Sequence, residues 1–322
     1  MKAAIRRFYG SSSAIKVEEI EKPAPKDNEL LIRVYATTVN RTDCANLTGK
    51  PFIMHLMLGL VNPRKIILGT DFAGVVEAVG KSCKSFRLNQ RVFGFTDMGL
   101  ESQAEFMVLT PKDNLVAIPD QVEFKQAVAS LEGAHYAHSF ILKSNIHSGQ
   151  KILINGATGA IGSALLQFAR TFDVQITATC NSENFELIRS LGADRVIDYA
   201  KEDFTKSNEK YDLVFDAVGK STFGKCKPIL EKNGIYISSE FGPYSQNVFY
   251  SLFTSLFGGK KVKFPIPYSL SMTLPYIKSK MEQGVFKPII DREYPLEEIA
   301  DAYTYVLSGR KIGNVLIEMT ND

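Results

Sequence analysis

Short apolar runs separated by turn residues make up the first third of the chain. The runs are rich in Val, Ile, Phe and Thr, which favour strands, and they read ELLIRVYATTVN, FAGVVEAVG, QRVFGF and AEFMVLT. This pattern predicts a compact, mostly antiparallel β domain over residues 1–122.

From about Glu123 the pattern changes to strands that alternate with helices. KILIN (151–155) reads as a short apolar strand, and residues 160–172 carry apolar side chains at helical spacing. VQITATC, RVIDY, YDLVFDAVG and GIYISS follow as further strands with helical stretches between them. The alternation predicts a parallel sheet covered by helices over residues 123–289, so the fold class is α/β.

The C-terminal part changes pattern again. Residues 295–307 predict a helix with proline in its first turn, and NVLIEM (314–319) predicts one last strand. We expect residues 290–322 to return to the first domain, which would then comprise 1–122 and 290–322.

One uncharged stretch, residues 241–259, has about the length of a bilayer span. It holds proline, glutamine, asparagine and several serines and glycines, which disfavour a membrane span. We expect a buried segment or an interface here instead.

Composition narrows the function classes. A formal charge of +3 over 322 residues does not suggest nucleic-acid binding. The four cysteines are scattered without a C-x-x-C pair, so neither a zinc site nor a disulfide framework is predicted. Reduced thiols and an N-terminus without a signal-peptide core indicate a cytoplasmic protein.

A Gly-rich turn follows the strand KILIN. Its residues are Gly156, Ala157, Thr158, Gly159, Ala160, Ile161 and Gly162. In a dinucleotide fingerprint the middle glycine lets the backbone approach a pyrophosphate, and the last lets the helix pack on the strand. The helix N-terminus then offers N–H groups and a positive dipole end to the phosphates. The turn therefore predicts a nicotinamide dinucleotide site.

The end of the second strand distinguishes the two nicotinamide cofactors. NAD-preferring sites place Asp or Glu there to bond the ribose hydroxyls, whereas this chain has Asn181 and Ser182. Small hydrogen-bonding groups accept a 2′-phosphate, which favours NADPH over NADH. The same two residues could instead cap the next helix.

Together the motifs make the chain resemble the medium-chain dehydrogenase/reductase superfamily, in its zinc-independent, quinone oxidoreductase-like branch. The resemblance covers nearly the whole chain, and the motifs that carry it are VNRTD (39–43), GTDFAGVVEAVG (69–80), RVFGF, NGATGAIG, LGADRVIDY, YDLVFDAVG and RKIGNVLI. It implies a GroES-like catalytic domain built from both chain ends, with a doubly wound Rossmann domain between them.

The resemblance also implies further cofactor residues. Tyr199 would lie near the adenosine 2′-phosphate, or it could be ordinary packing. Val218 and Gly219 would pass close to the nicotinamide half. Ser238 and Ser239 would end a strand at the same rim, or they could be turn residues. No Lys or Arg stands at 181–184, where some relatives grip the 2′-phosphate.

Zinc chemistry is not expected from the residue types. Zinc alcohol dehydrogenases of this superfamily place Cys where this chain has Asn40 and His where it has Thr70. A catalytic zinc needs about three Cys, His or carboxylate ligands. Without zinc as the Lewis acid, hydride transfer suits an acceptor already activated by conjugation, such as a quinone or an α,β-unsaturated carbonyl.

Three residues are candidates for catalysis. Asn40 could donate a hydrogen bond toward the substrate carbonyl or the carboxamide, and Asp43 could act there or belong to a structural network. Tyr136 stands where this family more often has Thr, and its phenol could donate to a developing enolate oxygen or pack as a wall. His135 and His138 flank it, and we expect surface or capping roles for both.

We therefore predict an NADPH-dependent reductase of quinones or enones. The alternatives are a zinc-free alcohol dehydrogenase and a non-catalytic NADPH-binding or sensing protein. By resemblance we expect a homodimer formed by pairing Rossmann edge strands, with residues 241–259 at that interface or in the wall of the substrate cleft.

Overall fold

A computed structural model describes residues 1–112, 114–264 and 268–319. The chain forms two compact units: unit 1 comprises Met1–Glu132 and Ser269–Asp322, and unit 2 comprises Gly133–Tyr268. The division predicted from the sequence, with boundaries at 122/123 and 289/290, stays a prediction.

Unit 1 is built on a mostly antiparallel sheet, as the short β-rich runs predict. Within its described residues the main sheet has the order β14-β15-β3-β4-β5-β7, β6 pairs with β3, and β1 pairs with β2 separately. The strands are β1 (Lys2–Ile5), β2 (Lys16–Glu19), β3 (Leu30–Val39), β4 (Asp71–Val79), β5 (Arg91–Phe95), β6 (Phe106–Leu109), β7 (Leu115–Ala117), β14 (Ile290–Pro295) and β15 (Asn314–Glu318).

The last strand belongs to the main sheet of unit 1. β15 pairs antiparallel with β3, from Val315 opposite Val39 to Glu318 opposite Ala36. The helices of this unit are α1 (Arg41–Thr48), α2 (Ile53–Leu58), α3 (Phe124–Ala129), α9 (Leu270–Glu282) and α10 (Ile299–Leu307). Apolar side chains from the sheet and from α10, such as Phe72, Val315 and Ile299, share one buried core.

Unit 2 is built on a parallel sheet. Among the residues that the structure describes, its strand order is β10-β9-β8-β11-β12-β13. The strands are β8 (Lys151–Asn155), β9 (Gln175–Cys180), β10 (Arg195–Asp198), β11 (Tyr211–Asp216), β12 (Leu230–Ser238) and β13 (Lys261–Lys263). Numbered along the chain this is the order 3-2-1-4-5-6, which is that of the doubly wound dinucleotide-binding fold.

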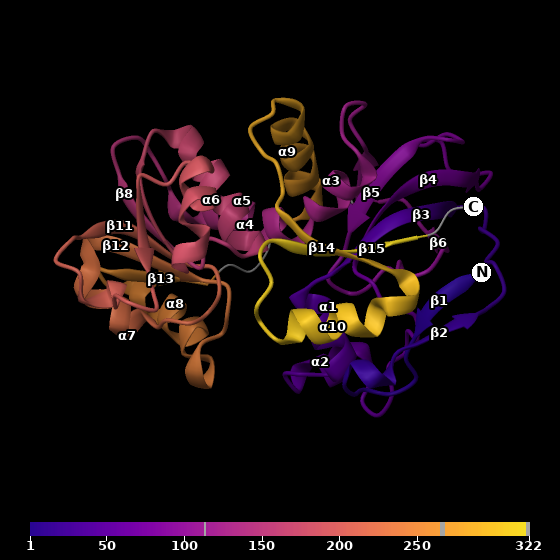
Figure 1. Ribbon diagram of the computed structural model, residues 1–322, viewed down its shortest axis with the longest axis horizontal. Helices are drawn as coiled ribbons and strands as arrows, with labels where there is room; N and C mark the ends of the chain where they lie inside the picture. The colour runs from indigo at the N-terminus through magenta and orange to yellow at the C-terminus, as the bar shows by residue number, and fades with distance from the viewer. Residues whose placement is uncertain (113, 265–267, 320–322) are drawn as a thin grey trace. The chain divides into compact units, whose positions relative to one another are not determined.

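Helices cover both sides of this sheet. They are α4 (Glu132–Ser144), α5 (Ala160–Ala169), α6 (Phe185–Ser190), α7 (Phe223–Cys226) and α8 (Gln246–Leu256). Figure 1 shows α5 and α6 along one side and α7 and α8 along the other. Because parallel crossovers are right-handed, the reversal of strand order between β8 and β11 moves the helices to the opposite face. The carboxyl ends of β8 and β11 therefore meet where a ligand crevice is expected.

The uncharged stretch 241–259 contains α8, and its exposure differs from our expectation of burial. Phe249, Leu252, Phe253 and Leu256 of this helix are all more than half exposed. The prediction that this segment is buried is therefore wrong for this face of α8, and the alternative that it forms an interface stays a prediction. Within the described part of the chain, we find no helix with both the length and the apolar character needed to cross a bilayer.

Candidate functional site

The Gly-rich turn joins β8 to α5 at the carboxyl edge of the parallel sheet. Gly156 has a φ of +82°, and a Cβ there would lie 2.3 Å from Val218 Cγ1. A Cβ on Gly162 would lie 2.2 Å from the Gly156 carbonyl oxygen. These two positions need glycine for the turn itself and for close packing of the helix on the strand.

Gly159 is different, because the fold does not require glycine there. Its φ is −71°, and a Cβ would lie 3.6 Å from the Gly156 carbonyl oxygen, an ordinary contact. In the described part of the chain, no side chain caps the N-terminus of α5. An uncapped helix N-terminus behind a bare backbone leaves room for a phosphate to approach the N–H groups, so this turn fits a pyrophosphate.

The remaining residues of the turn are placed by the strand and the helix. Ala157 is buried and its N–H donates to the Thr179 carbonyl oxygen over 3.1 Å. Thr158, Ala160 and Ile161 are partly exposed. The turn therefore presents a short accessible stretch of backbone on a buried base.

Buried side chains tie together four strand ends behind this turn. Thr179 Oγ1 donates to Asn155 Oδ1 over 2.7 Å, and Asn155 Nδ2 donates to Asp216 over 2.9 Å. Asp216 also accepts the Ser221 N–H over 2.9 Å and the Tyr236 hydroxyl over 3.0 Å. Our sequence analysis assigned no role to this network. The sequence feature that indicates this network is the aspartate at the end of the apolar run in YDLVFDAVG.

The loops after β11 and β12 meet at the same edge. Gly219 has a φ of +64°, and a Cβ there would lie 2.1 Å from Glu240 Cγ. The Glu240 N–H is 3.3 Å from Ser238 Oγ, which accepts from it. Ser238 is buried, whereas Val218 and Ser239 are partly exposed. The structure thus brings these predicted cofactor residues to one rim.

The predicted adenosine residues follow β9 and β10. These strands are parallel and paired to their last residues, so Asn181 and Tyr199 leave the sheet side by side. Asn181, Ser182 and Tyr199 are exposed. Asn181 occupies an N-cap position, but in the residues described its side chain makes no capping bond. Lys201 lies two residues beyond Tyr199, exposed and 3.5 Å from Asp198, and is a cation that our sequence analysis missed.

In unit 1, Asn40 lies between β3 and α1 and is the N-cap of that helix. Its side-chain oxygen accepts the Asp43 N–H over 2.8 Å, and the Asn40 N–H donates to the Asp43 carboxylate over 3.1 Å. This reciprocal pair is a capping box. The amide nitrogen donates to Thr70 Oγ1 over 2.8 Å, and the residue is buried. The structure therefore engages both ends of the Asn40 amide within the protein.

Two buried carboxyl groups lie beside Asn40. Asp71 accepts the N–H and the hydroxyl of Thr38 over 2.8 and 2.5 Å, and the hydroxyl of Thr37 over 3.1 Å. Burial raises the pKa of Asp71 to about 6 despite these bonds. Burial and the charge of Asp71 raise the pKa of Asp43 well above its usual range. The three donor groups that face Asp71, against one that faces Asp43, favour the ionised form of Asp71 over that of Asp43.

Glu132 is a third carboxyl group that our sequence analysis missed. One of its oxygens accepts the Thr42 hydroxyl over 2.5 Å and the Thr42 N–H over 3.3 Å. Burial raises its pKa to about 7, against the opposing charge of Lys311. Burial lowers the pKa of Lys311 in turn. A carboxyl group with this pKa can give or take a proton near neutral pH.

Tyr136 lies in unit 2 on α4, partly exposed, with its ring centroid 5.5 Å from that of His135. His135 and His138 are buried, so the expectation of surface or capping roles is wrong. Burial lowers the pKa of each to about 4, which leaves both rings neutral at pH 7. They lie on the packed side of a helix, a fact that residue type does not reveal.

No metal-binding group is found within residues 1–112, 114–264 and 268–319, where no three His, Cys, Asp or Glu side chains come close enough together. Asn40 and Thr70, which stand in place of two zinc ligands, are hydrogen-bonded to each other.

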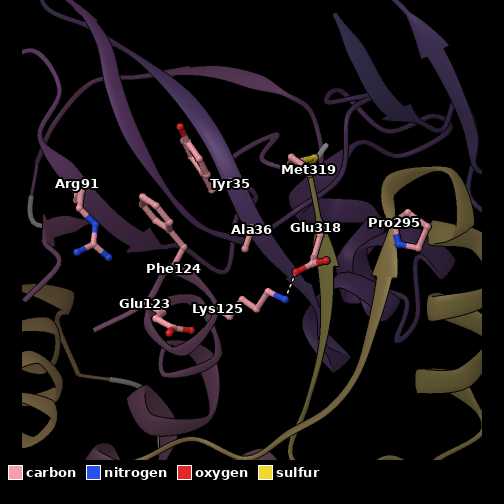
Figure 2. A pocket seen from close by; sticks show the side chains of 9 residues that line it. All are labelled: Tyr35, Ala36, Arg91, Glu123, Phe124, Lys125, Pro295, Glu318 and Met319. Atoms are coloured by element: carbon pink, nitrogen blue, oxygen red, sulfur yellow. Dashed lines mark ion pairs between the residues drawn. The ribbon is translucent and has the colours of Figure 1, made fainter. Parts of the chain in front are cut away.

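Unit 1 also has a cavity of about 590 Å³, and none of the predicted site residues lines it. Figure 2 shows Lys125 directed toward Glu318, with Arg91 beside Phe124. Lys125 also pairs with Glu293 over 2.7 Å, and Arg91 lies 4.7 Å from the Phe124 ring. These charges already have partners within the protein. The cavity is lined by Tyr35, Ala36, Arg91, Glu123, Phe124, Lys125, Pro295, Glu318 and Met319.

Comparison with known proteins agrees with the two-part fold. A family model described as an alcohol dehydrogenase GroES-like domain matches residues 26–120, and one described as a zinc-binding dehydrogenase matches residues 191–317. A solved quinone oxidoreductase from Coxiella burnetii has a TM-score of 0.86 at 21% identity and covers 99% of both chains. The predicted α/β class, with a GroES-like domain and a Rossmann domain, is confirmed.

Curated relatives match over almost the whole chain. The 2-methylene-furan-3-one reductase of Solanum lycopersicum is 30% identical and covers 98% of this chain and 79% of its own length. The chloroplastic NADPH-dependent alkenal/one oxidoreductase of Arabidopsis thaliana is 29% identical with the same coverage.

Proposed function

The chain belongs to the medium-chain dehydrogenase/reductase superfamily, in its quinone oxidoreductase-like branch, and we propose that it is an NADPH-dependent reductase of quinones or α,β-unsaturated carbonyls. The observation that carries this proposal is the turn at Gly159, which leaves an open backbone at the switch point of a doubly wound sheet. The names of the two curated relatives support the same acceptor class.

NADPH is favoured over NADH by the side chains beyond β9 and β10. Asn181 and Ser182 offer hydrogen bonds without a carboxylate, and Lys201 offers a positive charge at the same edge. A 2′-phosphate gains from that charge, whereas a 2′-hydroxyl does not. When bound, NADPH would supply the hydride, and the residues of the Gly-rich turn would hold its pyrophosphate.

The Lys201→Ala variant tests this cofactor preference. We expect the KM for NADPH to rise about three- to tenfold, with the KM for NADH unchanged, because one exposed phosphate contact is lost. Lys206→Ala is the matched control, since Lys206 is also exposed and also pairs with an aspartate. Equal effects of Lys201→Ala on both cofactors would show that Lys201 does not read the 2′-phosphate.

The polar residues of the catalytic proposal have separate roles. We propose that Asn40 acts as a positioning residue, because its amide already bonds Asp43 and Thr70. We propose that Asp43, whose pKa burial raises, has the structural role of closing that capping box through the Asn40 N–H. Tyr136 is the proposed donor to the developing enolate oxygen, with Tyr136→Phe expected to lower kcat more than KM.

The acceptor is proposed to be conjugated because the chain offers no zinc-type ligand set at Asn40 and Thr70. A quinone or an enone needs no strong Lewis acid, since hydride addition places the negative charge on an oxygen that hydrogen bonds can stabilise. The proton that completes the reduction would come from solvent or from a side chain.

The test measures NADPH oxidation with a quinone, an enal and an enone as acceptors. A parallel assay measures NADP⁺ reduction with a simple alcohol as the donor. We expect turnover with conjugated acceptors and none with the alcohol. Alcohol oxidation would instead support a zinc-free alcohol dehydrogenase. Bound NADPH without turnover on any acceptor would support a binding or sensing protein.

A homodimer and a cytoplasmic location are further proposals. The four cysteines are unpaired in the structure, which suits a reducing compartment. β13 ends the parallel sheet and could pair with its counterpart in a second copy. Light scattering after size-exclusion chromatography measures the oligomeric state. Fractionation of the native host measures the location of the protein.

A further inference from the structure

Glu132 and Thr42 form a short hydrogen-bonded pair in unit 1. Glu132 Oε1 accepts the Thr42 hydroxyl over 2.5 Å and the Thr42 N–H over 3.3 Å. Thr42 lies in the first turn of α1, two residues beyond the N-cap Asn40. The pair is therefore joined by the backbone to the buried polar cluster of Asn40 and Asp43.

The exposure of this pair distinguishes it from the other carboxyl groups of the cluster. Glu132 and Thr42 are only partly buried, whereas Asp43 and Asp71 are fully buried. Within the described residues, the hydrogen bonds to Glu132 reach only one of its two carboxyl oxygens. A carboxyl group of this kind can take a proton from water at one oxygen and pass a proton to the hydroxyl at the other.

The charges around Glu132 keep both of its protonation states accessible. Burial has the largest effect and disfavours the carboxylate, and two aspartates act in the same direction. The Thr42 hydroxyl and Lys311 favour the carboxylate, and the result is a pKa of about 7. The charged groups within electrostatic reach of Glu132 or of Lys311 are Arg41, Asp43, Asp71, Asp97 and Asp291.

We propose that Glu132 supplies, through the Thr42 hydroxyl, the proton that completes the reduction of an α,β-unsaturated carbonyl. This inference rests on the proposed reductase function. Hydride addition at the β-carbon leaves an enolate, whose electron pair takes the Thr42 hydroxyl proton to form a C–H bond at the α-carbon. The Glu132 proton passes to Thr42 Oγ1 in the same step. Glu132 is left as a carboxylate and regains its proton from water.

Helix α4 gives this relay a second link to the proposed chemistry. Tyr136 follows Glu132 by four residues in α4, so the two side chains start from one face of the helix. Tyr136 is the proposed donor to the enolate oxygen. That hydrogen bond stabilises the enolate but does not form the C–H bond at the α-carbon, so the reaction needs a second, separate proton source.

The first test measures kcat for enone reduction with NADPH as a function of pH. In the native protein kcat should be constant below about pH 7 and fall about tenfold per pH unit above it, because only protonated Glu132 donates. Glu132→Gln and Thr42→Val should each lower kcat about a hundredfold near pH 6 and abolish this pH dependence. The double variant should be no slower than either single variant, because each substitution already breaks the relay.

Thr48→Val is the matched control. Thr48 is also partly buried and also lies in α1, but its hydroxyl donates to the Cys44 carbonyl oxygen over 2.8 Å. This variant should keep the kcat and the pH profile of the native protein. Far-UV circular dichroism and the thermal midpoint check that each variant folds.

A measurement without cofactor or acceptor examines the donor group directly. The infrared difference spectrum between the native protein and Glu132→Gln should contain a protonated carboxyl band that disappears as the pH rises through about 7. Thr42→Val should shift the frequency of this band, because the hydroxyl no longer bonds the carboxyl group. Absence of the band at about pH 6 would overturn the relay, since Glu132 would then hold no proton to give.

Quinone reduction separates failure of the relay from failure of the proposed function. A reduced quinone takes its protons on oxygen, which exchanges protons rapidly with water, so both relay variants should lose much less kcat with a quinone than with an enone. Equal losses on the two acceptors, additive losses in the double variant, or a native pH profile in Glu132→Gln would each show that Glu132 has only a structural role. A native protein that reduces neither acceptor would instead contradict the reductase function itself.

Discussion

The titration of Glu132 offers a direct test of how burial shapes the polar cluster of unit 1. Glu132→Gln keeps a side-chain oxygen that can accept the Thr42 hydroxyl, but it removes the ability to ionise. The substitution is nearly isosteric. Any pH-dependent difference between the two proteins therefore reports the proton on Glu132.

The magnitude follows from the pKa of the carboxyl group in the folded and unfolded chains. Burial raises this pKa from 4.5 to about 7. Below the lower value both chains hold the proton, so the titration contributes nothing. Between the two values the unfolded chain loses a proton that the folded chain keeps, and the free energy of unfolding falls as the pH rises. The full effect is about 3 kcal/mol, reached above the higher value.

Urea unfolding followed by far-UV circular dichroism measures this difference, since the chain contains no tryptophan. From about pH 5 to about pH 8, the unfolding free energy of Glu132→Gln should rise relative to the native protein by about 2–3 kcal/mol. Glu297→Gln is the control of opposite sign. The hydrogen bond from Lys2 lowers the pKa of Glu297, so this variant should lose a small, solvent-screened stabilisation at the higher pH.

A flat difference between native protein and Glu132→Gln across this pH range would falsify the reasoning, because it would mean that the folded and unfolded carboxyl groups titrate alike. A difference that falls with pH would mean that Glu132 is ionised in the folded protein and stabilised by Lys311. In that case pairing, and not burial, would control the site.

The glycines and the carboxyl pair give two further predictions. Gly162→Ala places a Cβ 2.2 Å from the Gly156 carbonyl oxygen, so it should lower both the thermal midpoint and the affinity for NADPH. Gly159→Ala places a Cβ 3.6 Å from the same oxygen, so it should weaken NADPH binding and leave the thermal midpoint unchanged. Unfolding of the second variant would contradict a ligand-only role for that glycine. Asp71→Asn should cost about 2–4 kcal/mol in urea unfolding at neutral pH, because it leaves buried donors without their acceptor, while Asp43→Asn, which mimics the protonated acid, should cost under about 1 kcal/mol. Equal costs would contradict the difference between the two carboxyl groups, and a larger cost for Asp43→Asn would reverse the assignment of the proton.

Local patterns predict local structure well in this chain because they carry the physical constraint themselves. The alternation of apolar runs and turn residues predicts a β domain and an α/β domain, and NVLIEM predicts the strand that pairs with β3. Gly156 and Gly162 indicate a tight strand-to-helix turn, because a residue with a Cβ does not fit at either position.

Properties that depend on contacts between residues far apart in the sequence cannot be predicted from local patterns. The sequence does not show that Thr70 and Asp43 are hydrogen-bonded to the amide of Asn40. Lys201 follows a different strand from Asn181, and only the pairing of β9 with β10 brings the two to one edge. The expectation for His135 failed because burial depends on what packs against a helix face.

The sequence by itself determined the family, the order of the strands along the chain and the position of the dinucleotide turn, because each depends on residues within a few positions of one another. Tertiary structure alone decided which carboxyl group keeps its proton and which face of α8 meets solvent. Both depend on desolvation and on bonds between segments far apart in the chain, such as Thr254 with Val262. The sequence near each group contains no record of those neighbours.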